Sequence, residues 1–376
     1  MTRRLRIGLV GADANGKGWA PMAHIPAIRG LEDVELWAVC TSHPESAAAA
    51  AKAYGVDRAF HDVGHMAATA GIDAVAVVVR AVHHHEAVLA ALNAGKHVYC
   101  EWPLGASIQQ TEELTAEARR QGVVTAVGLQ GRYTPALQYI KELVDEGWLG
   151  KLLSVDVSVV VGGSTELPSE ALWDRERKKG AHFFNVTGGH TVDTLQFCCG
   201  PLTRVSAKVA TQIQTVRFAD TGGLVDVETP DTVLFVGELG NGAAVSYRGA
   251  TVTTRPTGWR MELNGTLGTL VATTPVLPQI TPIELRGARG SDELAVLTVP
   301  ERLNSISGKV FGPARNVAGL YEGFARAIEM GGHFNPDFDH ALAVHRVLES
   351  LDKSSREGRA VVLDSSVSAA KGGKQS

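Results

Sequence analysis

A histidine and an aspartate three residues apart offer the most direct acid–base chemistry in this chain. They lie in the stretch Asn185-Val-Thr-Gly-Gly-His-Thr-Val-Asp193. In a helix, residues three or four apart share a face, so His190 and Asp193 would lie together with Phe197. Asp193 could then orient the imidazole of His190, which titrates near neutrality and can take a proton from a hydroxyl. A buried core histidine beside a structural aspartate fits the same residues, and the spacing leaves both interpretations open.

Aromatic and polar side chains just upstream of His190 are candidates for a substrate pocket. We expect them on a loop that comprises Trp173, Lys178, Lys179, Asn185 and Thr187. Lys179 could supply a cation to the pocket or be an ordinary solvated surface lysine. Flat indole faces can stack on sugar C–H groups, which makes Trp173 and Trp102 candidates by side-chain type. The sequence thus suggests substrate contacts from Trp102, Trp173, Asn185 and Thr187.

A glycine-rich run, Gly11-Ala-Asp-Ala-Asn-Gly-Lys-Gly18, follows an apolar strand expected over 5–10 and leads into a helix near Trp19. The dinucleotide fingerprint G-x-G-x-x-G needs glycines so that the backbone can approach a pyrophosphate at a helix N-terminus. Here the middle glycine is Asp13, whose carboxylate would repel phosphate unless it faces away. Lys17 could offset that charge or be solvated, and a plain glycine-rich turn fits the run as well. The candidate cofactor contacts are Gly11, Ala12, Asn15, Gly16 and Trp19.

The end of the second expected strand, residues 34–41, bears on which dinucleotide would bind. Proteins that prefer NAD commonly end this strand with an acidic residue, which binds the adenosine ribose and repels a 2′-phosphate. This chain has Thr41, Ser42 and His43 there instead, and these side chains could contact such a phosphate. No arginine completes the usual phosphate clamp. We therefore expect NADP or NAD as cofactor and favour NADP.

The stretch 97–103, His-Val-Tyr-Cys-Glu-Trp-Pro, predicts a short strand over 97–100 that ends in a turn. The carboxyl ends of parallel strands meet helix N-termini at one crevice, where ligands bind in open sheets. Glu101 and Trp102 are therefore candidate cofactor contacts, and the turn is a candidate floor for an active site.

Three consecutive histidines, 83–85, follow an apolar strand expected over 73–79 and the residue Arg80. Neighbours on a helix point about 100° apart and cannot all reach one ion. We expect no metal there. Arg80 joins the candidate cofactor contacts because it follows the end of that strand.

The elements expected along the chain change character after residue 150. Before it, apolar strands alternate with helices, which indicates a parallel sheet. After it, strand-like alternation and glycine turns indicate a mostly antiparallel sheet. The strands expected in this second part are 152–161, 203–215, 231–238, 243–250, 258–264 and 268–273. Helices are expected near 315–330 and 339–356, with a disordered tail over 365–376.

The composition is that of an ordinary globular protein with room for two domains. The chain has 376 residues, of which 44% are hydrophobic and 20% charged, and a formal net charge of −4. That charge and the lack of a basic stripe argue against nucleic-acid and membrane-surface partners. The apolar run after the N-terminus is too short for a signal sequence or a membrane span. Four cysteines form no C-x-x-C motif, so we expect buried thiols in a cytoplasmic protein.

The segment Ala94-Gly-Lys-His-Val-Tyr-Cys-Glu-Trp-Pro-Leu-Gly105 resembles the signature of the glucose–fructose oxidoreductase and inositol dehydrogenase (Gfo/Idh/MocA) family, usually AGKHV-x-x-EKP. The family's lysine, which helps to position substrate near the nicotinamide, is replaced by Trp102, which cannot supply a cation or take a proton. The family's Asp-x-Gly-x-His-x-x-Asp motif fits Gly188, His190 and Asp193, with Val186 in place of its first aspartate.

A side branch of that family, which includes the fungal galactose-regulon repressor, shares the tryptophan. The stretch 18–28, with its Gly-Trp-Ala and His-x-Pro-Ala-Ile, also resembles this branch. The resemblance implies an N-terminal Rossmann domain over 1–133, with a possible return of the helix at 335–356. It also implies an α+β domain over 134–364 with a large, mostly antiparallel open sheet through which such proteins often form homodimers or homotetramers.

The resemblance further assigns roles to individual residues. The register of the family's Pro-x-x-x-His motif places its histidine at His84, which would pack under the cofactor loop. Arg132 matches the Arg-Tyr-x-Pro turn of the family and could bind substrate or tie loops together. The histidine of the family's second motif commonly acts as acid and base beside the nicotinamide, which implies that role for His190, with Asp193 orienting it.

Three functions are compatible with the resemblance. The first is an NAD(P)-dependent oxidoreductase that moves a hydride between nicotinamide and a sugar, polyol or related carbonyl compound. The second is a dinucleotide-binding sensor without turnover, like the repressor. The third is elimination or epimerisation with internal return of the hydride.

Overall fold

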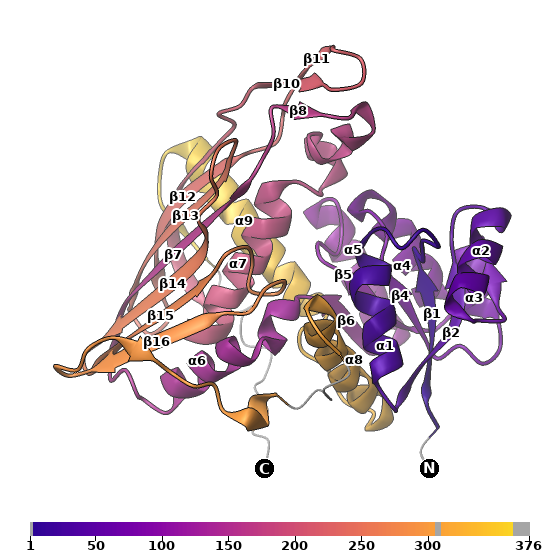
Figure 1. Ribbon diagram of the computed structural model, residues 1–376, viewed down its shortest axis with the longest axis horizontal. Coiled ribbons are helices and arrows are strands. Elements are labelled where there is room, and N and C mark those ends of the chain that lie inside the picture. Colours follow the sequence, from indigo (N-terminus) through magenta and orange to yellow (C-terminus); the bar gives the residue numbers. More distant parts are fainter. Residues whose placement is uncertain (1–2, 305–309, 364–376) are drawn as a thin grey trace. The chain divides into compact units, whose positions relative to one another are not determined.

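The computed structural model describes residues 3–304 and 310–363, so the expected disordered tail lies outside the described residues. The chain divides into two compact units. The first comprises Met1–Tyr133 and Ser305–Leu342, and the second Thr134–Asn304 and Ala343–Ser376. Figure 1 shows a sheet with helices in each unit.

The first unit is built on a six-stranded parallel sheet with the order β3-β2-β1-β4-β5-β6. Its strands are β1 (Leu5–Val10), β2 (Val34–Cys40), β3 (Ala59–Phe60), β4 (Ala74–Val77), β5 (His97–Glu101) and β6 (Thr125–Gly128). The order reverses between β1 and β4, the place where open sheets of this kind bind ligands at their strand ends. The predicted Rossmann architecture is confirmed.

Helices cover the strands of the first unit. They are α1 (Ile25–Gly30), α2 (Pro44–Tyr54), α3 (Val63–Ala68), α4 (His84–Asn93), α5 (Ile108–Gln121) and α8 (Pro313–Glu329), with short helical turns η1 (Ala20–His24), η2 (Ala81–His83) and η3 (Gln130–Tyr133). Helix α8 packs against α1, η1 and η3, and its Tyr321 and Phe324 are fully buried in the core. Of the residues 335–356, whose return we predicted as possible, 335–342 belong to this unit, together with α8.

The second unit contains a nine-stranded sheet with the order β17-β16-β15-β14-β7-β13-β12-β9-β18. Only β7 and β13 pair in parallel, so the expected mostly antiparallel sheet is confirmed. The strands are β7 (Leu152–Gly162), β9 (Leu202–Ala210), β12 (Thr232–Leu239), β13 (Ala244–Val252), β14 (Gly258–Gly265), β15 (Gly268–Thr274), β16 (Glu284–Arg289), β17 (Ala295–Val296) and β18 (Val361–Val362). Helices α6 (Pro135–Asp145), α7 (Phe183–Cys199) and α9 (Phe338–Glu357) lie on one face (Figure 1).

One predicted strand, 203–215, is wrong in its extent. The Asp231 carboxylate accepts hydrogen bonds from the backbone N–H groups of Gln212 and Ile213, which draws the chain out of the sheet after β9. A separate small sheet follows, formed by β8 (Glu166–Leu167), β10 (Thr215–Phe218) and β11 (Leu224–Asp226). The alternation of apolar and polar residues, on which the strand prediction was based, does not indicate that the Asp231 carboxylate accepts hydrogen bonds from two backbone N–H groups here.

Candidate functional site

The glycine loop of the first unit combines one tightly enclosed glycine with two open ones. Gly11 has φ +97°, and a Cβ at that position would overlap the carbonyl oxygen of Val78. Gly16 and Gly18 also have positive φ, but a Cβ on either would meet nothing within 4 Å. The loop therefore needs Gly11 for its close approach to the end of β4 and leaves the backbone at Gly16 and Gly18 open to a ligand.

Asp13, the residue in place of the middle glycine, is folded into its own loop. Its Oδ1 accepts a hydrogen bond of 2.8 Å from the backbone N–H of Asn15, and its carbonyl accepts one from Tyr54. Asn15 is exposed and Ala12 is buried. Because the Asp13 carboxylate accepts this hydrogen bond within the loop, its repulsion toward a nearby phosphate is reduced.

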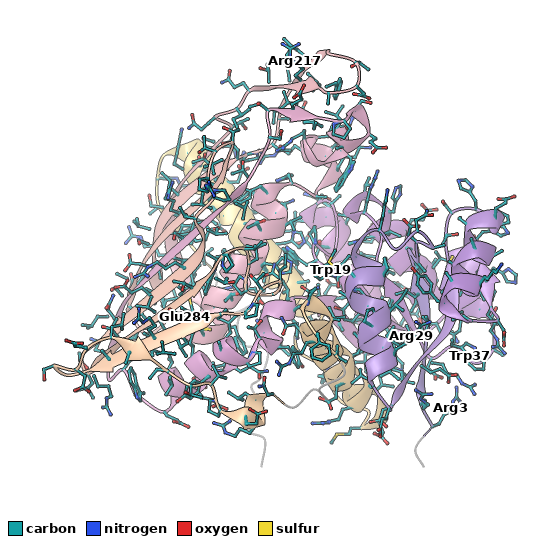
Figure 2. The ribbon with its side chains drawn as sticks, viewed as in Figure 1. Arg3, Trp19, Arg29, Trp37, Arg217 and Glu284 are labelled. Atoms are coloured by element: carbon teal, nitrogen blue, oxygen red, sulfur yellow. The ribbon has the colours of Figure 1, made fainter. Side chains whose placement is uncertain are left out.

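Trp19 lies where the loop runs into the first helical segment (Figure 2). Within the described residues, its indole N–H is buried and has no hydrogen-bond partner. Buried donors are seldom left unpaired, so a ligand oxygen is a fitting acceptor. Together with the open glycines, this orphaned donor indicates that the loop fits a dinucleotide pyrophosphate.

Strand β2 ends at Cys40, and the residues that follow it, 41–43, include no acidic side chain. The Thr41 hydroxyl lies 2.7 Å from that of Ser46 and donates to the carbonyl of His43, while Ser42 and His43 are exposed. Helix α2 begins directly after His43 and has no side-chain cap. Its first N–H groups and the exposed side chains are therefore the local donors that an adenosine ribose or its phosphate would meet.

Glu101, at the carboxyl end of β5, is held in a cage of hydrogen-bond donors. Its Oε1 lies 3.0 Å from His24 Nε2, from the Tyr99 hydroxyl and from Gln130 Nε2. Its Oε2 lies 2.7 Å from the same Gln130 nitrogen. Gly128 is required beside this cage, because a Cβ there would come within 2.5 Å of the carboxylate.

The cage continues to helix α8 through His24, which is fully buried. Tyr321 on α8 contacts His24 Nδ1 at 2.8 Å and stacks on Tyr99 with ring centroids 4.9 Å apart. Burial, and then the Glu101 carboxylate, raise the pKa of both phenols well above the usual value. Tyr99 and Tyr321 therefore keep their protons and act as donors.

His84 joins the ends of two strands. Its Nδ1 lies 2.7 Å from the carbonyl of Pro103, and its Nε2 lies 3.0 Å from that of Val79. Burial lowers the pKa of this imidazole, so the neutral ring donates to one carbonyl at a time. Its neighbour His85 instead contacts Glu113 at 2.9 Å. Among the residues that the structure describes, no group of three or more acidic, histidine or cysteine side chains is arranged for a metal ion.

The remaining candidates in the first unit differ in exposure. Trp102 is buried, with 5% of its surface exposed, and its peptide bond to Pro103 is cis. Arg80 is exposed at the start of η2. The Arg132 guanidinium lies 2.6 Å from His340 Nε2 and 3.4 Å from Asn335 Oδ1. Such contacts are what a residue that links two segments of the chain would make.

Helix α7 carries His190 and Asp193 one turn apart in the second unit. Both are buried, His190 at 9% and Asp193 at 1% exposure, whereas Phe197 is half-buried. The Thr194 hydroxyl donates to the backbone carbonyl of His190, so this hydroxyl has its hydrogen-bond partner within α7. Helical spacing therefore brings the imidazole and the carboxylate to one side of α7, as a base and its orienting group require.

The loop that we predicted before His190 is wrong. Asn185 and Thr187 lie in the first turns of α7, because the helix already begins at Phe183 after an extended His182. Lys178 and Lys179 lie in a 3-10 turn, η5 (Arg177–Lys179), where Lys178 is exposed and Lys179 is half-buried. Trp173 is half-buried in a second one, η4 (Ser169–Asp174).

His182, at the start of α7, makes the stability of the second unit depend on pH. Burial, and then the nearby Arg177, lower its pKa to about 4. Between pH 6.5 and 4 the unfolded chain binds a proton here that the folded chain does not, so stability is lost as pH falls through this range.

We expect the free energy of unfolding to drop by about 1.6 kcal/mol between pH 6.5 and pH 5 through His182 alone. Urea unfolding of the protein and of His182→Phe at both pH values measures this. The variant keeps the ring stacking on Phe184 but cannot titrate, so it should lose less stability on acidification. An equal loss in both proteins would show that His182 is not the group responsible.

Four cysteines, Cys40, Cys100, Cys198 and Cys199, are buried and form no disulfide, as predicted. No helix in residues 3–304 or 310–363 combines the length and apolar character needed to cross a membrane.

Comparison with known proteins now identifies the family. Residues 5–129 match the model of the Gfo/Idh/MocA oxidoreductase family with its NAD-binding Rossmann fold, and residues 135–274 match the model of the Gal80p C-terminal domain. Dehydrogenase aclE of Aspergillus oryzae is 31% identical over 249 residues, which cover 64% of this chain and 68% of that protein. The chain belongs to the Gfo/Idh/MocA family.

Other relatives place this Gfo/Idh/MocA protein near the Gal80 branch. The galactose/lactose metabolism regulatory protein GAL80 of Saccharomyces cerevisiae is 29% identical over 287 residues, which cover 71% of this chain. The chain spans only 66% of the length of GAL80. A levoglucosan dehydrogenase solved with NADH and L-sorbose has the same fold, with a TM-score of 0.82 and 22% identity over 96% of this chain and all of that one.

The donor cage around Glu101 was missed by sequence reasoning. His24, Tyr99, Gln130 and Tyr321 come from four separate elements. His24 belongs to the stretch 18–28, whose motif is visible in the sequence. No periodic pattern in the sequence connects it with Tyr321 on α8, which lies 297 positions further along the chain.

Proposed function

We propose that this Gfo/Idh/MocA protein is an NAD(P)-dependent oxidoreductase that acts on a CH–OH group of a sugar, polyol or related carbonyl compound. The observation that carries the proposal is the pair His190 and Asp193, buried one turn apart on α7 of an oxidoreductase-family protein. Relatives named as a levoglucosan dehydrogenase and a 1,5-anhydro-D-fructose reductase support the sugar class.

The first unit would hold the dinucleotide. Gly11, Ala12, Asn15, Gly16 and Trp19 would contact the pyrophosphate, and Thr41, Ser42 and His43 the adenosine ribose. The remaining proposed contacts are Arg80, His84, Glu101 and Trp102. The bound nicotinamide would supply the hydride acceptor or donor. NAD is supported by the family model, and we extend the proposal to NADP because no acid ends β2 to repel a 2′-phosphate.

The second unit would supply the proton chemistry. His190 would take the hydroxyl proton during oxidation and return it during reduction, while Asp193 would orient the imidazole. Asn185, Thr187 and Trp173 are proposed substrate contacts, together with Arg132 and Trp102 from the first unit. His190 Nδ1 or Nε2 needs to reach the reacting hydroxyl directly or through one water.

A second candidate function is a dinucleotide-binding regulator without turnover. Two observations favour it: the residue after Glu101 is Trp102, which cannot carry a charge, and a match to the Gal80p C-terminal domain covers residues 135–274. The His190 imidazole and the Asp193 carboxylate, one turn apart on α7, favour the enzyme.

One experiment separates these functions. Purified protein is titrated with NADH and NADPH by fluorescence, and then a panel of sugars, polyols and keto-sugars is screened with each cofactor at 340 nm. The enzyme predicts tight cofactor binding and an absorbance change with at least one substrate class. If the protein binds cofactor but gives neither an absorbance change nor a rearranged product, the result would support the regulator without turnover. Product analysis covers epimerisation or elimination, which returns the hydride internally.

The open face of the nine-stranded sheet is the proposed interface for a homodimer or homotetramer. It carries a shallow hollow in which Leu234 and Val236 on β12 are 43% and 60% exposed. Their cross-strand neighbours include Arg248 and Ser246 on β13. Exposed apolar side chains surrounded by polar ones are typical of protein contact surfaces.

A charge in the centre of this hollow should break the assembly. We expect Val236→Asp to reduce the molar mass measured by light scattering to that of one chain, because a buried unpaired carboxylate is costly at an interface. Leu224→Asp is the matched control, since Leu224 is 68% exposed on the separate small sheet. If Val236→Asp keeps the mass of the unaltered protein, another surface holds the assembly. The proposed compartment is the cytoplasm, which suits four cysteines that form no disulfide.

A further inference from the structure

Three buried side chains of the first unit form a continuous line of hydrogen bonds that ends at the strand edge. Tyr321 on α8 contacts His24, and His24 contacts Glu101. Tyr321 and His24 are fully buried, and the Glu101 side chain is 12% exposed. Of these three residues, only Glu101 has a side chain that is partly exposed.

Hydrogen-bond chemistry sets the direction of this line. A carboxylate only accepts, so His24 Nε2 carries the hydrogen that faces Glu101. In a neutral imidazole the other nitrogen is then an acceptor, and the Tyr321 hydroxyl donates to it. Both ring nitrogens of His24 and the Tyr321 hydroxyl are thus hydrogen-bonded, which restrains the rotation of both side chains.

The cage loads the two oxygens of Glu101 unequally. Among the described residues, Oε1 accepts from His24, Tyr99 and Gln130, whereas Oε2 accepts only from the Gln130 amide. The carbonyl oxygen of that same amide, Gln130 Oε1, is buried and has no partner among the described residues. Two acceptors with spare capacity, Glu101 Oε2 and Gln130 Oε1, therefore belong to one cluster, and they call for a ligand that donates hydrogen.

The position of Glu101 and Gln130 in the sheet indicates which half of a dinucleotide would lie near them. In a sheet of this strand order the adenosine half lies over the β1 and β2 side of the switch point and the nicotinamide half over the other. Glu101 ends β5, on the nicotinamide side. Ribose hydroxyls and a carboxamide N–H₂ are the donors that the nicotinamide half offers.

We propose that His24 and Tyr321 are positioning residues that hold the Glu101 carboxylate in place for the nicotinamide half of the dinucleotide. The proposal rests on the proposed function, because it requires a bound nicotinamide nucleotide. Helix α8 thereby controls the cofactor site through a residue that touches no ligand.

The test compares two ligands on the full chain by calorimetry: NADH, and ADP, which lacks both the nicotinamide and its ribose. His24→Asn removes the donor to Glu101, whereas His24→Gln can keep an amide near the position of Nε2. We expect His24→Asn to bind NADH about tenfold more weakly, since a hydrogen bond to a charged group is lost. His24→Gln should recover most of this loss, and ADP should bind all proteins equally.

Two further variants keep the test decisive. Tyr321→Phe is nearly isosteric and should weaken NADH binding about threefold without affecting ADP binding. This variant covers the case in which His24→Asn does not fold. His85→Asn breaks the exposed contact with Glu113 and should change neither affinity. Unchanged NADH binding in folded His24 and Tyr321 variants, or equal losses for both ligands, would overturn the positioning role. Absence of NADH binding to the unaltered protein would instead defeat the proposed function, and this inference with it.

Discussion

Replacing His190 with asparagine should lower kcat by about 10²- to 10⁴-fold, the usual contribution of a positioned acid–base group. Asparagine is close in size and polar but cannot accept a proton at neutral pH. NADH affinity should remain within about twofold, because the imidazole is assigned to the proton and not to the cofactor. Steady-state kinetics on the substrate found by the screen, with NADH titration of the same protein, measures both.

Two companion measurements make the His190 result interpretable. His61→Asn changes an exposed histidine of the first unit and should leave kcat unaltered. Thermal unfolding of His190→Asn reports whether the loss comes from the fold, since His190 is buried. If the folded variant retains full kcat, His190 is a core histidine and another group moves the proton.

Replacing Gly11 with alanine should lower the free energy of unfolding by about 2–4 kcal/mol and abolish dinucleotide binding. Gly11 has φ +97°, which strains any other residue, and its new Cβ would overlap the rigid carbonyl of Val78. Relief would require the loop to move away from the end of β4. Urea unfolding and NADH titration test the two effects separately.

Gly16→Ala is the matched control for this loss of stability. It has a similar positive φ of +71°, but its Cβ would meet nothing within 4 Å. Only the backbone strain, about 1 kcal/mol, should therefore appear in unfolding. Equal losses at both positions would mean that the overlap with Val78 is relieved at no cost.

Local patterns account for much of what could be predicted. The apolar runs at 5–10 and 74–77 are buried on both faces of a parallel sheet and therefore lack alternation. The glycine loop and the Glu-Trp-Pro turn follow their strands directly. In contrast, the strand predicted over 203–215 ended early because the Asp231 carboxylate captures two amides from a distant part of the chain.

The sequence by itself determined that a Rossmann unit precedes a mostly antiparallel sheet, and that His190 and Asp193 share a side of one helix. Those features depend on residues close together in the chain, where periodicity is physically meaningful. Only the tertiary structure decided that Glu101 is held by His24, Tyr99, Gln130 and, at one remove, Tyr321. Hydrogen bonds between buried side chains depend on where distant elements pack, and no spacing in the sequence records that.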